Sequence, residues 1–431
     1  MTTPGRQRRR LTATETDLDV RRQLAFLISV YQSSDAHDAE MALDELSLLV
    51  ETAGSDPIDE AVLRRPRLDP ATFIGNGQAA ELAQRTRALD IDVVVFDNSL
   101  TPTQQRNLQK IFHCDVVDRT AVILDIFAQH ATSAAGMLQV ELAQLRYLAP
   151  RLRGKGTELS RLAGGIGTRG PGESKLETDR RRIAGRITKL EKELTHISRV
   201  RATQAKSRER SGQFRMALVG YTNAGKSTLL NALTDADALT EDQLFSTLDA
   251  TVRRMEMPGR DWLVSDTVGF VRSLPHELVE AFRSTLYEVS GADLLLHVVD
   301  GSDPEPERQV AAVREVLSQI DAHEIPQVLA VNKSDSADPN TIRRLLASHR
   351  PSIALSATEG TGIDKLKSLL VEVARSHARV VELRIPYDRS RIVSELHELG
   401  EVIEQSHEER FTRLRVRLSP AVADRFTDYQ L

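Results

Sequence analysis

Hydrophobic residues along the chain form short continuous runs that alternate with stripes at helical spacing. From about Val20 to Ala131, apolar runs such as VVVF (93–96) and CDVVD (114–118) alternate with helical patterns. Such runs are typical of strands buried on both faces, and their alternation with helices indicates a parallel sheet covered by helices. The pattern predicts an α/β domain over residues 21–135, which follows a polar, disordered tail at residues 1–20.

Two long apolar stripes come next, one at Leu138, Leu142, Leu145, Leu148 and Leu152, the other at Ile183, Ile187, Leu190, Leu194 and Ile197. Spacings of three and four place each set on one face of a helix, which predicts an antiparallel helical hairpin over residues 136–212. Between the stripes, LAGGIGTRGPGESK (162–175) contains five glycines and a proline. This composition predicts a flexible loop at the hairpin tip.

From Phe214 the pattern changes to strand, glycine loop and helix, and α/β alternation continues to about His377. This predicts a domain over residues 213–377 with a mostly parallel sheet and flanking helices. Two strand-like runs, VVELRIPY and RFTRLRVRL, and a helix from Ser390 to Leu399 then predict a small α+β domain over residues 378–431. The expected fold class is a multidomain α/β chain.

Charge is distributed unevenly along the sequence. The whole chain has a net charge of −5, yet residues 151–215 contain 18 Lys and Arg against 7 Asp and Glu. This basic segment favours a nucleic-acid partner over a merely solvated helix surface. Its candidate RNA-binding residues are Arg169, Lys175, Arg180, Arg181 and Arg182.

No apolar run approaches the length of a membrane span, and the amino terminus has no signal-peptide pattern. We therefore expect a cytoplasmic protein without stable membrane insertion, and a monomer. The single cysteine, Cys114, lies in an apolar run and is interpreted as a core residue.

A phosphate-binding loop is predicted by MALVGYTNAGKSTLLNAL (216–233), which contains G-x-x-x-x-G-K-[ST] between an apolar strand and an amphipathic helix. In such loops the backbone amides surround phosphates, the lysine reaches the β and γ oxygens, and the serine ligates Mg²⁺. The predicted nucleotide-binding residues here are Gly220, Asn223, Ala224, Gly225, Lys226, Ser227 and Thr228.

Four further stretches narrow the nucleotide to GTP. Asp266 ends the apolar run WLVSD and could hold Mg²⁺ through water, while Gly269 could offer its amide to the γ-phosphate. In LFSTLDAT, Thr247 is favoured over Thr251 as the second Mg²⁺ ligand beside Ser227.

Guanine recognition is predicted by VLAVNKSD (328–335) and IALSATEGTG. Their candidate residues are Asn332, Lys333, Asp335, Ser356 and Ala357. An aspartate at position 335 would accept from guanine N1 and N2, a pattern that adenine cannot offer.

The residue that follows Gly269 is a phenylalanine, whereas many GTPases have a water-positioning glutamine there. Because Phe270 cannot hold a water, no catalytic side chain is assigned. We expect slow intrinsic GTP hydrolysis and stimulation by a partner.

The chain resembles the HflX family of translational GTPases over nearly its whole length. The stretches that carry the resemblance include FIGNGQAAEL, DRTAVILDIFAQHA, LQVELAQLRYLAPRLRG, GTRGPGESKLETDRRRI and DTVGFVRSLPHELVEAFRSTL. It implies binding to the large ribosomal subunit and its rRNA, separation of stalled ribosomes into subunits under stress, and GTP hydrolysis stimulated by that subunit. Ala250 replaces a proline that is usual in the family.

Asn223 resembles the loop asparagine of potassium-activated GTPases, so a bound K⁺ is an alternative source of the missing catalytic charge.

Two other functions compete with ribosome separation. One is a G domain that serves an RNA-modification or ribosome-assembly system, but residues 1–212 show no suitable catalytic or metal-binding cluster. The other is a membrane-trafficking switch, which the lack of lipidation motifs disfavours.

Overall fold

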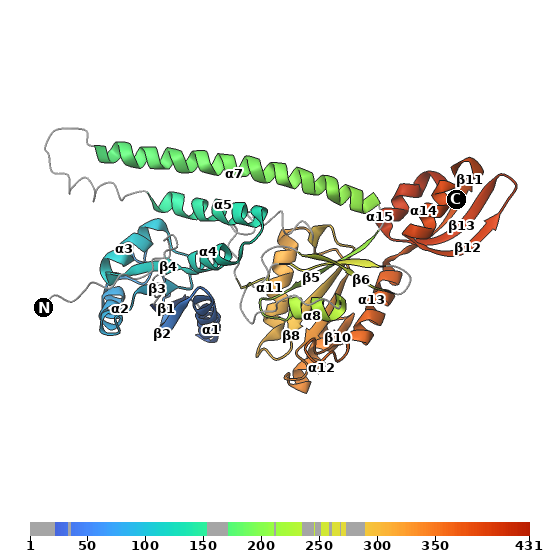
Figure 1. The fold of residues 1–431 in the computed structure, drawn as a ribbon. Coiled ribbons are helices and arrows are strands. Elements are labelled where there is room, and N and C mark those ends of the chain that lie inside the picture. The colour runs from blue at the N-terminus through green and yellow to red at the C-terminus, as the bar shows by residue number, and fades with distance from the viewer. Residues whose placement is uncertain are drawn as a thin grey trace. The chain divides into compact units, whose positions relative to one another are not determined.

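The structure, a computed structural model, describes residues 22–32, 36–152, 171–210, 213–234, 245, 251–257, 261–267, 269–272 and 289–431. Within these ranges, the side chains of residues 171–179, 201–210 and 420–421 are outside the description. The chain divides into two compact units, residues 1–194 and 195–431, and each is described by itself (Figure 1). The finer boundaries at residues 20, 135, 212 and 377 remain a prediction.

A four-stranded parallel sheet of order β2-β1-β3-β4 forms the centre of the first unit. Its strands are β1 (Gln23–Tyr31), β2 (Ser55–Arg64), β3 (Val93–Phe96) and β4 (Asp115–Asp118). Helices α1 (Ala36–Thr52), α2 (Asn76–Ala88) and α3 (Pro102–Phe112) connect these strands, and α4 (Arg119–His130) follows the last one. Helix α1 contacts α4, and α2 contacts α3. The predicted parallel α/β layer is therefore confirmed, and its two short strands lie at the predicted residues.

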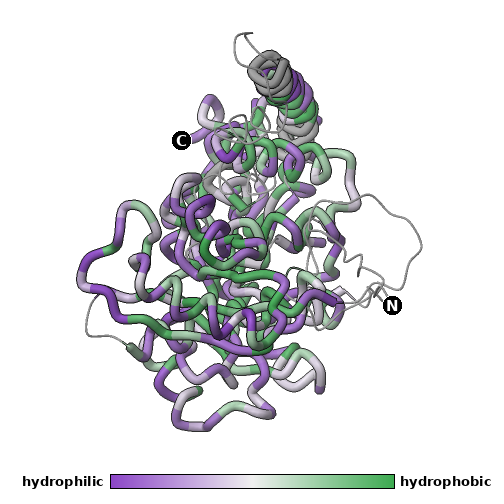
Figure 2. Tube along the Cα trace, turned by 90° about the vertical axis from the view of Figure 1, so that its left-hand side faces the viewer, coloured by the Kyte–Doolittle hydropathy of each residue, from purple (hydrophilic) through white to green (hydrophobic). Residues whose placement is uncertain are grey.

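Two further helices of this region are α5 (Ala134–Arg151) and α7 (Pro171–Arg210). They run in opposite directions in Figure 1, and Arg186 of α7 forms a bidentate ion pair with Glu141 of α5, with both contacts at 2.6 Å. Leu190, from the predicted apolar stripe, is fully buried. Figure 2, in which α7 appears almost end-on at the top, shows polar and apolar residues interspersed along the coloured part of this helix.

The predicted tip loop is too long at its carboxyl end. Helix α7 begins at Pro171, so residues 171–175, including Lys175, are helical rather than part of a loop. The reason is that proline is well suited to the first helical position, where no backbone N–H is needed and φ is already helical.

The second unit contains a six-stranded sheet of order β10-β9-β8-β5-β7-β6, in which only the β6–β7 pair is antiparallel. Its strands are β5 (Phe214–Gly220), β6 (Val252–Met255), β7 (Trp262–Ser265), β8 (Leu294–Asp300), β9 (Gln327–Asn332) and β10 (Ser352–Ala354). The helices α8 (Lys226–Thr234), α11 (Pro306–Gln319), α12 (Pro339–Ser348) and α13 (Ile363–His377) follow strands of this sheet. A mostly parallel sheet with flanking helices is the predicted fold.

A three-stranded antiparallel sheet of order β11-β13-β12 ends the chain. It comprises β11 (Arg379–Pro386), β12 (Glu401–His407) and β13 (Phe411–Leu418), with α14 (Arg391–Leu399), α15 (Pro420–Ala423) and two short 3-10 helices, Tyr387–Arg389 and Asp424–Tyr429. Strand β12 was not predicted, because all but one of its residues, EVIEQSH, are exposed and its sequence lacks an apolar face. Among the helices that the structure describes, none combines the length and the hydropathy that a bilayer crossing requires.

Candidate functional site

The predicted phosphate-binding loop lies between the carboxyl end of β5 and the first turn of α8. Gly225 has φ of 85°, and a Cβ there would overlap Nδ2 of Asn332. Asn223 also has a positive φ of 57°, and its side chain is exposed. The loop is thus a tight turn, and Gly225 has no side chain to cover the backbone where the loop approaches β9. Phosphate binding through backbone amides requires such an accessible backbone.

Lys226 is the first residue of α8 and is only 7% exposed. Its Nζ donates to the backbone oxygens of Tyr221 at 2.8 Å and Gly220 at 3.2 Å. Burial lowers the pKa of Lys226 to about 8, and the negative charge of Asp266 opposes this change. A buried ammonium that donates its hydrogen bonds to neutral carbonyl oxygens is suited to receive an anion.

Ser227 and Asp266 meet although 39 positions separate them. Ser227 Oγ donates to Asp266 Oδ2 at 2.7 Å, and Asp266 is 2% exposed. A hydroxyl and a carboxylate are hard oxygen ligands of the kind that Mg²⁺ prefers. Ser227 and Asp266 therefore form a donor set that fits Mg²⁺.

Gly269 approaches the loop closely, since a Cβ there would lie 2.7 Å from Cγ2 of Thr222 and 3.2 Å from Nζ of Lys226. Phe270 donates its N–H to Gly220 O at 3.1 Å and accepts from Thr222 N at 2.8 Å. Its ring is 1% exposed, in a cluster that includes Val219, Leu295 and Val313. The side chain at the position of the usual glutamine therefore belongs to the hydrophobic core.

The predicted base-binding segments also come together. Asn332 Nδ2 donates to Ala224 O at 2.9 Å, and Asn332 Oδ1 accepts from Ala357 N at 2.9 Å. This one amide links the phosphate loop to the segment after β10. Hydrogen bonding from Ser356 lowers the pKa of the exposed Asp335, so its carboxylate is ionised and can accept hydrogen bonds.

Sequence reasoning missed Asp300, the last residue of β8. Its Oδ2 lies 2.7 Å from Nζ of Lys333, which has a φ of 57°. Asp300 lies at the carboxyl end of a buried strand, as Asp266 and Asn332 do, and this position at the carboxyl edge of the sheet was the available signal.

Several predicted site residues cannot be placed. Thr247 and Arg169 lie outside the described residues, and so does the side chain of Lys175. The alternative Thr251 is exposed, and its backbone oxygen accepts from Asp266 N at 3.0 Å. Arg180, Arg181 and Arg182 are all exposed on α7.

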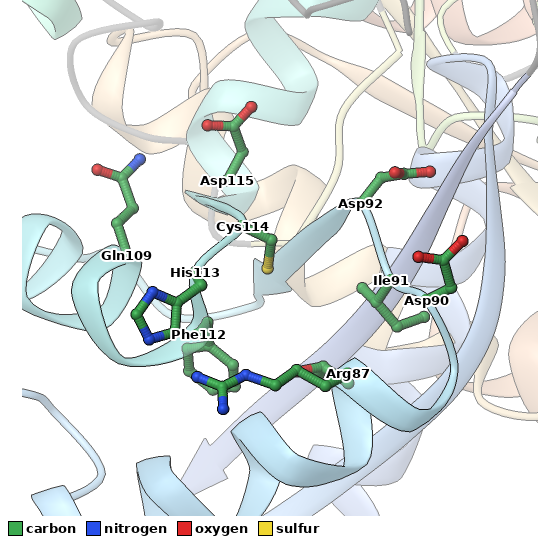
Figure 3. A pocket seen from close by; sticks show the side chains of 10 residues that line it. Arg87, Asp90, Ile91, Asp92, Gln109, Phe112, His113, Cys114 and Asp115 are labelled. Carbon is green, nitrogen blue, oxygen red and sulfur yellow. The ribbon is translucent and has the colours of Figure 1, made fainter. Parts of the chain in front are cut away.

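A cavity of about 740 Å³ lies in the first unit, at the ends of α2 and α3 and the starts of β3 and β4 (Figure 3). Cys114 lines it and is half-buried against the core rather than fully within it. Burial and the charge of Asp115 raise the pKa of the Cys114 thiol to about 11, which makes it a poor nucleophile. No group of three or more His, Cys, Asp or Glu within the described ranges is arranged to hold a metal ion. We assign no chemistry to this cavity.

Comparison with known families gives three matches along the chain. Residues 40–128 match the model described as "GTP-binding GTPase N-terminal", and residues 130–208 match "GTP-binding GTPase Middle Region". Residues 215–333, which contain the phosphate loop, match "50S ribosome-binding GTPase".

Relatives match over nearly the whole chain. A GTPase HflX from Caldanaerobacter subterraneus subsp. tengcongensis is 42% identical over 409 residues, which cover 95% of this chain and 94% of the relative. A GTPase HflX from Magnetococcus marinus is 44% identical, with 93% and 94% covered, and one from Escherichia coli (strain K12) is 42% identical, with 89% and 91% covered. The chain therefore belongs to the HflX family of GTPases, which hydrolyse GTP.

Proposed function

We propose that this GTPase binds the large ribosomal subunit and separates stalled or idle ribosomes into subunits under stress. In this proposal the GTP-bound form binds and separates, the ribosome stimulates hydrolysis, and hydrolysis serves release. The main observation in support of partner-stimulated hydrolysis is that Phe270 is buried in the core.

The site residues have the following roles in the proposal. Lys226 and the amides of the loop bind the β- and γ-phosphates, and the Gly269 amide faces the γ-phosphate. Ser227, Thr247 and Asp266 would hold Mg²⁺. Mg²⁺ neutralises phosphate charge when bound, and Asp335, with the backbone at Ser356 and Ala357, selects guanine.

Phe270 explains why hydrolysis would depend on a partner. A side chain packed in the core cannot turn toward the γ-phosphate without opening that core, so it cannot align the attacking water. A partner that supplies a group in trans or orders the switch segments contributes a factor of about 10³ to 10⁵ in other GTPases.

Two observations support the ribosome as this partner. The model that matches residues 215–333 is described as a ribosome-binding GTPase, and the exposed Arg180, Arg181 and Arg182 lie side by side in sequence on α7. Exposed arginines bind RNA phosphates through charge and bidentate hydrogen bonds. In this proposal the protein acts in the cytoplasm, where free ribosomes are found. It acts there as a monomer.

The test is GTP turnover with and without purified large subunits, in potassium and in sodium buffers. We expect strong stimulation by the subunits in both buffers. Fast turnover in potassium without subunits would instead favour a K⁺ ion held by Asn223. The alternative function, in RNA modification or ribosome assembly, predicts binding to precursor particles and no separation of mature ribosomes.

A further inference from the structure

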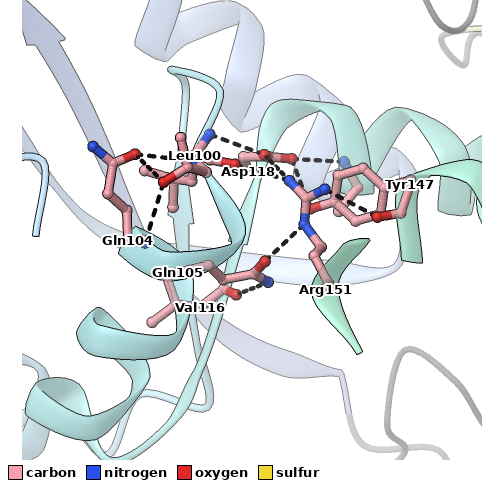
Figure 4. Close-up of polar contacts among 9 residues, drawn as sticks. Leu100, Gln104, Gln105, Val116, Asp118, Tyr147 and Arg151 are labelled. Carbon is pink, nitrogen blue, oxygen red and sulfur yellow. Dashed lines mark hydrogen bonds and ion pairs between the residues drawn. The ribbon is translucent and has the colours of Figure 1, made fainter. Parts of the chain in front are cut away.

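Asp118, at the carboxyl end of β4, is the centre of a buried polar cluster in the first unit (Figure 4). It is 1% exposed and accepts four hydrogen bonds. The donors are Leu100 N at 3.1 Å, Ala121 N at 3.1 Å, Tyr147 Oη at 3.0 Å and Arg151 Nη2 at 3.1 Å. The carboxylate thereby joins the loop after β3, the start of α4 and the last turns of α5.

Arg151, the last helical residue of α5, makes more contacts than a lysine could reproduce. Its guanidinium donates to Gln105 Oε1 at 2.8 Å, Leu100 O at 2.9 Å, Tyr147 O at 3.0 Å and Asp118 Oδ2 at 3.1 Å. The guanidinium carbon also lies 3.4 Å from the centre of the Tyr147 ring. Four of the five N–H groups are used, in a planar geometry that an ammonium lacks.

The end of α5 needs such a contact because Pro150 lies in its last turn. Proline has no N–H to donate to the carbonyl four residues earlier, so this turn lacks one helical hydrogen bond. The bonds from Arg151 tie the turn to β4 and α3 instead. A buried ion pair often adds less stability than apolar side chains of similar volume would, because both charges lose their hydration. Its directional hydrogen bonds instead favour one geometry of the turn.

Helix α5 in turn holds the part of α7 that carries the exposed arginines. Glu141 of α5 pairs with Arg186, and Arg146 of α5 pairs with Glu191 at 2.8 Å. Arg180–Arg182 precede Arg186 by one to two helical turns. A continuous series of contacts thus leads from Asp118 through α5 to these arginines.

We propose that Arg151, together with Asp118 and Tyr147, is a positioning residue that holds α5 and α7 in the orientation with which Arg180–Arg182 bind ribosomal RNA. This inference rests on the proposed function. It differs from a direct RNA contact by Arg151, whose side chain is only 16% exposed.

The first arm of the test needs no ribosome. Two variants, Arg151→Lys and Asp118→Asn, are compared with the parent protein by amide hydrogen exchange. In both variants exchange should be faster at the end of α5 and in residues 180–194, but not in β1 or β3. Arg64→Lys, at an exposed arginine at the end of β2, is the matched control. Exchange unchanged in both variants, or faster throughout the unit, would overturn the positioning role.

The second arm measures the affinity of Arg151→Gln, of Asp118→Asn and of the double variant for purified large subunits across a salt series. If the competent orientation falls to a tenth of the population, affinity falls about tenfold while its salt slope is unchanged. The double variant Asp118→Asn/Arg151→Gln should be no weaker than either single change, and GTP turnover without ribosomes should be unchanged. A slope lowered by about one unit would indicate a direct phosphate contact and contradict the proposal.

The two proposals fail in different ways. Faster exchange with unchanged ribosome affinity, in an assay where Arg180–Arg182→Gln does weaken binding, would reject the positioning role alone. If the parent protein does not bind large subunits, the proposed function fails, and exchange still shows whether Arg151 orders the hairpin.

Discussion

Lys226 shows, at the scale of one residue, how a binding site reduces the stability of the ligand-free protein. Burial lowers the pKa of its ammonium to about 8, and the charge of Asp266 compensates only in part. In the unfolded chain this lysine has an ordinary pKa near 10.5. Between about pH 8 and 10.5 the unfolded state therefore binds more protons, so the stability of the ligand-free protein rises with pH in that window.

Replacing Lys226 with methionine should raise the free energy of unfolding of the ligand-free protein at pH 7, by up to roughly 3 kcal/mol. Gly220 O and Tyr221 O keep backbone partners, from Phe270 N and Ala224 N. The same change should abolish GTP binding and the stabilisation that GTP provides. Urea unfolding at pH 7 and at pH 10, with and without GTP, measures both effects. A lower midpoint for the variant without ligand would contradict the cost assigned to this charge.

Phe270→Gln should not speed intrinsic GTP hydrolysis, because the backbone directs this side chain into the core beside Val219 and Leu295. Phe270→Ala should cost about 3 to 5 kcal/mol in unfolding free energy. Phe270→Leu, which keeps most of the apolar volume, is the control and should cost much less. Single-turnover rates and urea midpoints test this, and a faster rate in the glutamine variant would show that the side chain reaches the nucleotide.

Asp335→Asn should reduce GTP affinity by about 10² or more, since an amide cannot accept from both guanine N1 and N2. Xanthosine triphosphate has a carbonyl in place of the N2 amino group, so the variant should bind it better than the parent does. Competition binding with the two nucleotides measures this exchange. Unaltered GTP preference would show that another residue reads the base.

At the scale of elements, α7 combines two surfaces on one helix. Its apolar stripe, with Leu190 buried and Ile183 and Ile187 half-buried, faces inward, while Arg180–Arg182 are exposed. A helix with one apolar stripe can be fixed by packing and still offer charge to a partner.

Changing Arg180–Arg182 to glutamine should weaken binding to large subunits and lower its salt slope by about 2 to 3 units, because up to three phosphate contacts are lost. GTP turnover without ribosomes should stay the same. The control replaces Lys365, Lys367 and Arg375 on α13, which removes the same charge from the other unit. Equal slopes for all three proteins would mean that the arginines of α7 are merely solvated.

At the scale of the whole molecule, the nucleotide site and the Arg180–Arg182 surface lie in different units of the chain. The boundary between the units falls inside α7, after Leu194. Helix α7 therefore contributes residues to both units.

If the GTP-bound form is the one that binds, a non-hydrolysable GTP analogue should support subunit binding and ribosome separation, while release should require hydrolysis. Sucrose-gradient sedimentation of ribosomes with the analogue, GTP or GDP would show this as protein retained on large subunits only with the analogue. Equal retention with GDP and with the analogue would show that ribosome binding does not depend on the nucleotide state.

The sequence by itself determined the class of the fold and the location of the nucleotide site. Apolar runs mark β3, β5 and β9, because a strand that is buried on both faces has apolar residues at nearly every position. The phosphate loop is equally local, because its function uses the backbone of consecutive residues, from Gly220 to Ser227. Strand β12 was missed, since an edge strand exposed at nearly every position has no such pattern.

Only the tertiary structure decided which distant residues meet and which side chains are withdrawn from solvent. The sequence shows that Phe270 is not a glutamine, but its burial depends on strands and a helix elsewhere in the chain. The contacts of Asp300 with Lys333 and of Asp118 with Arg151 join residues 33 positions apart in each case. Such pairs follow from strand order and helix packing, which are set by the burial of the whole core and leave no signature in any single segment.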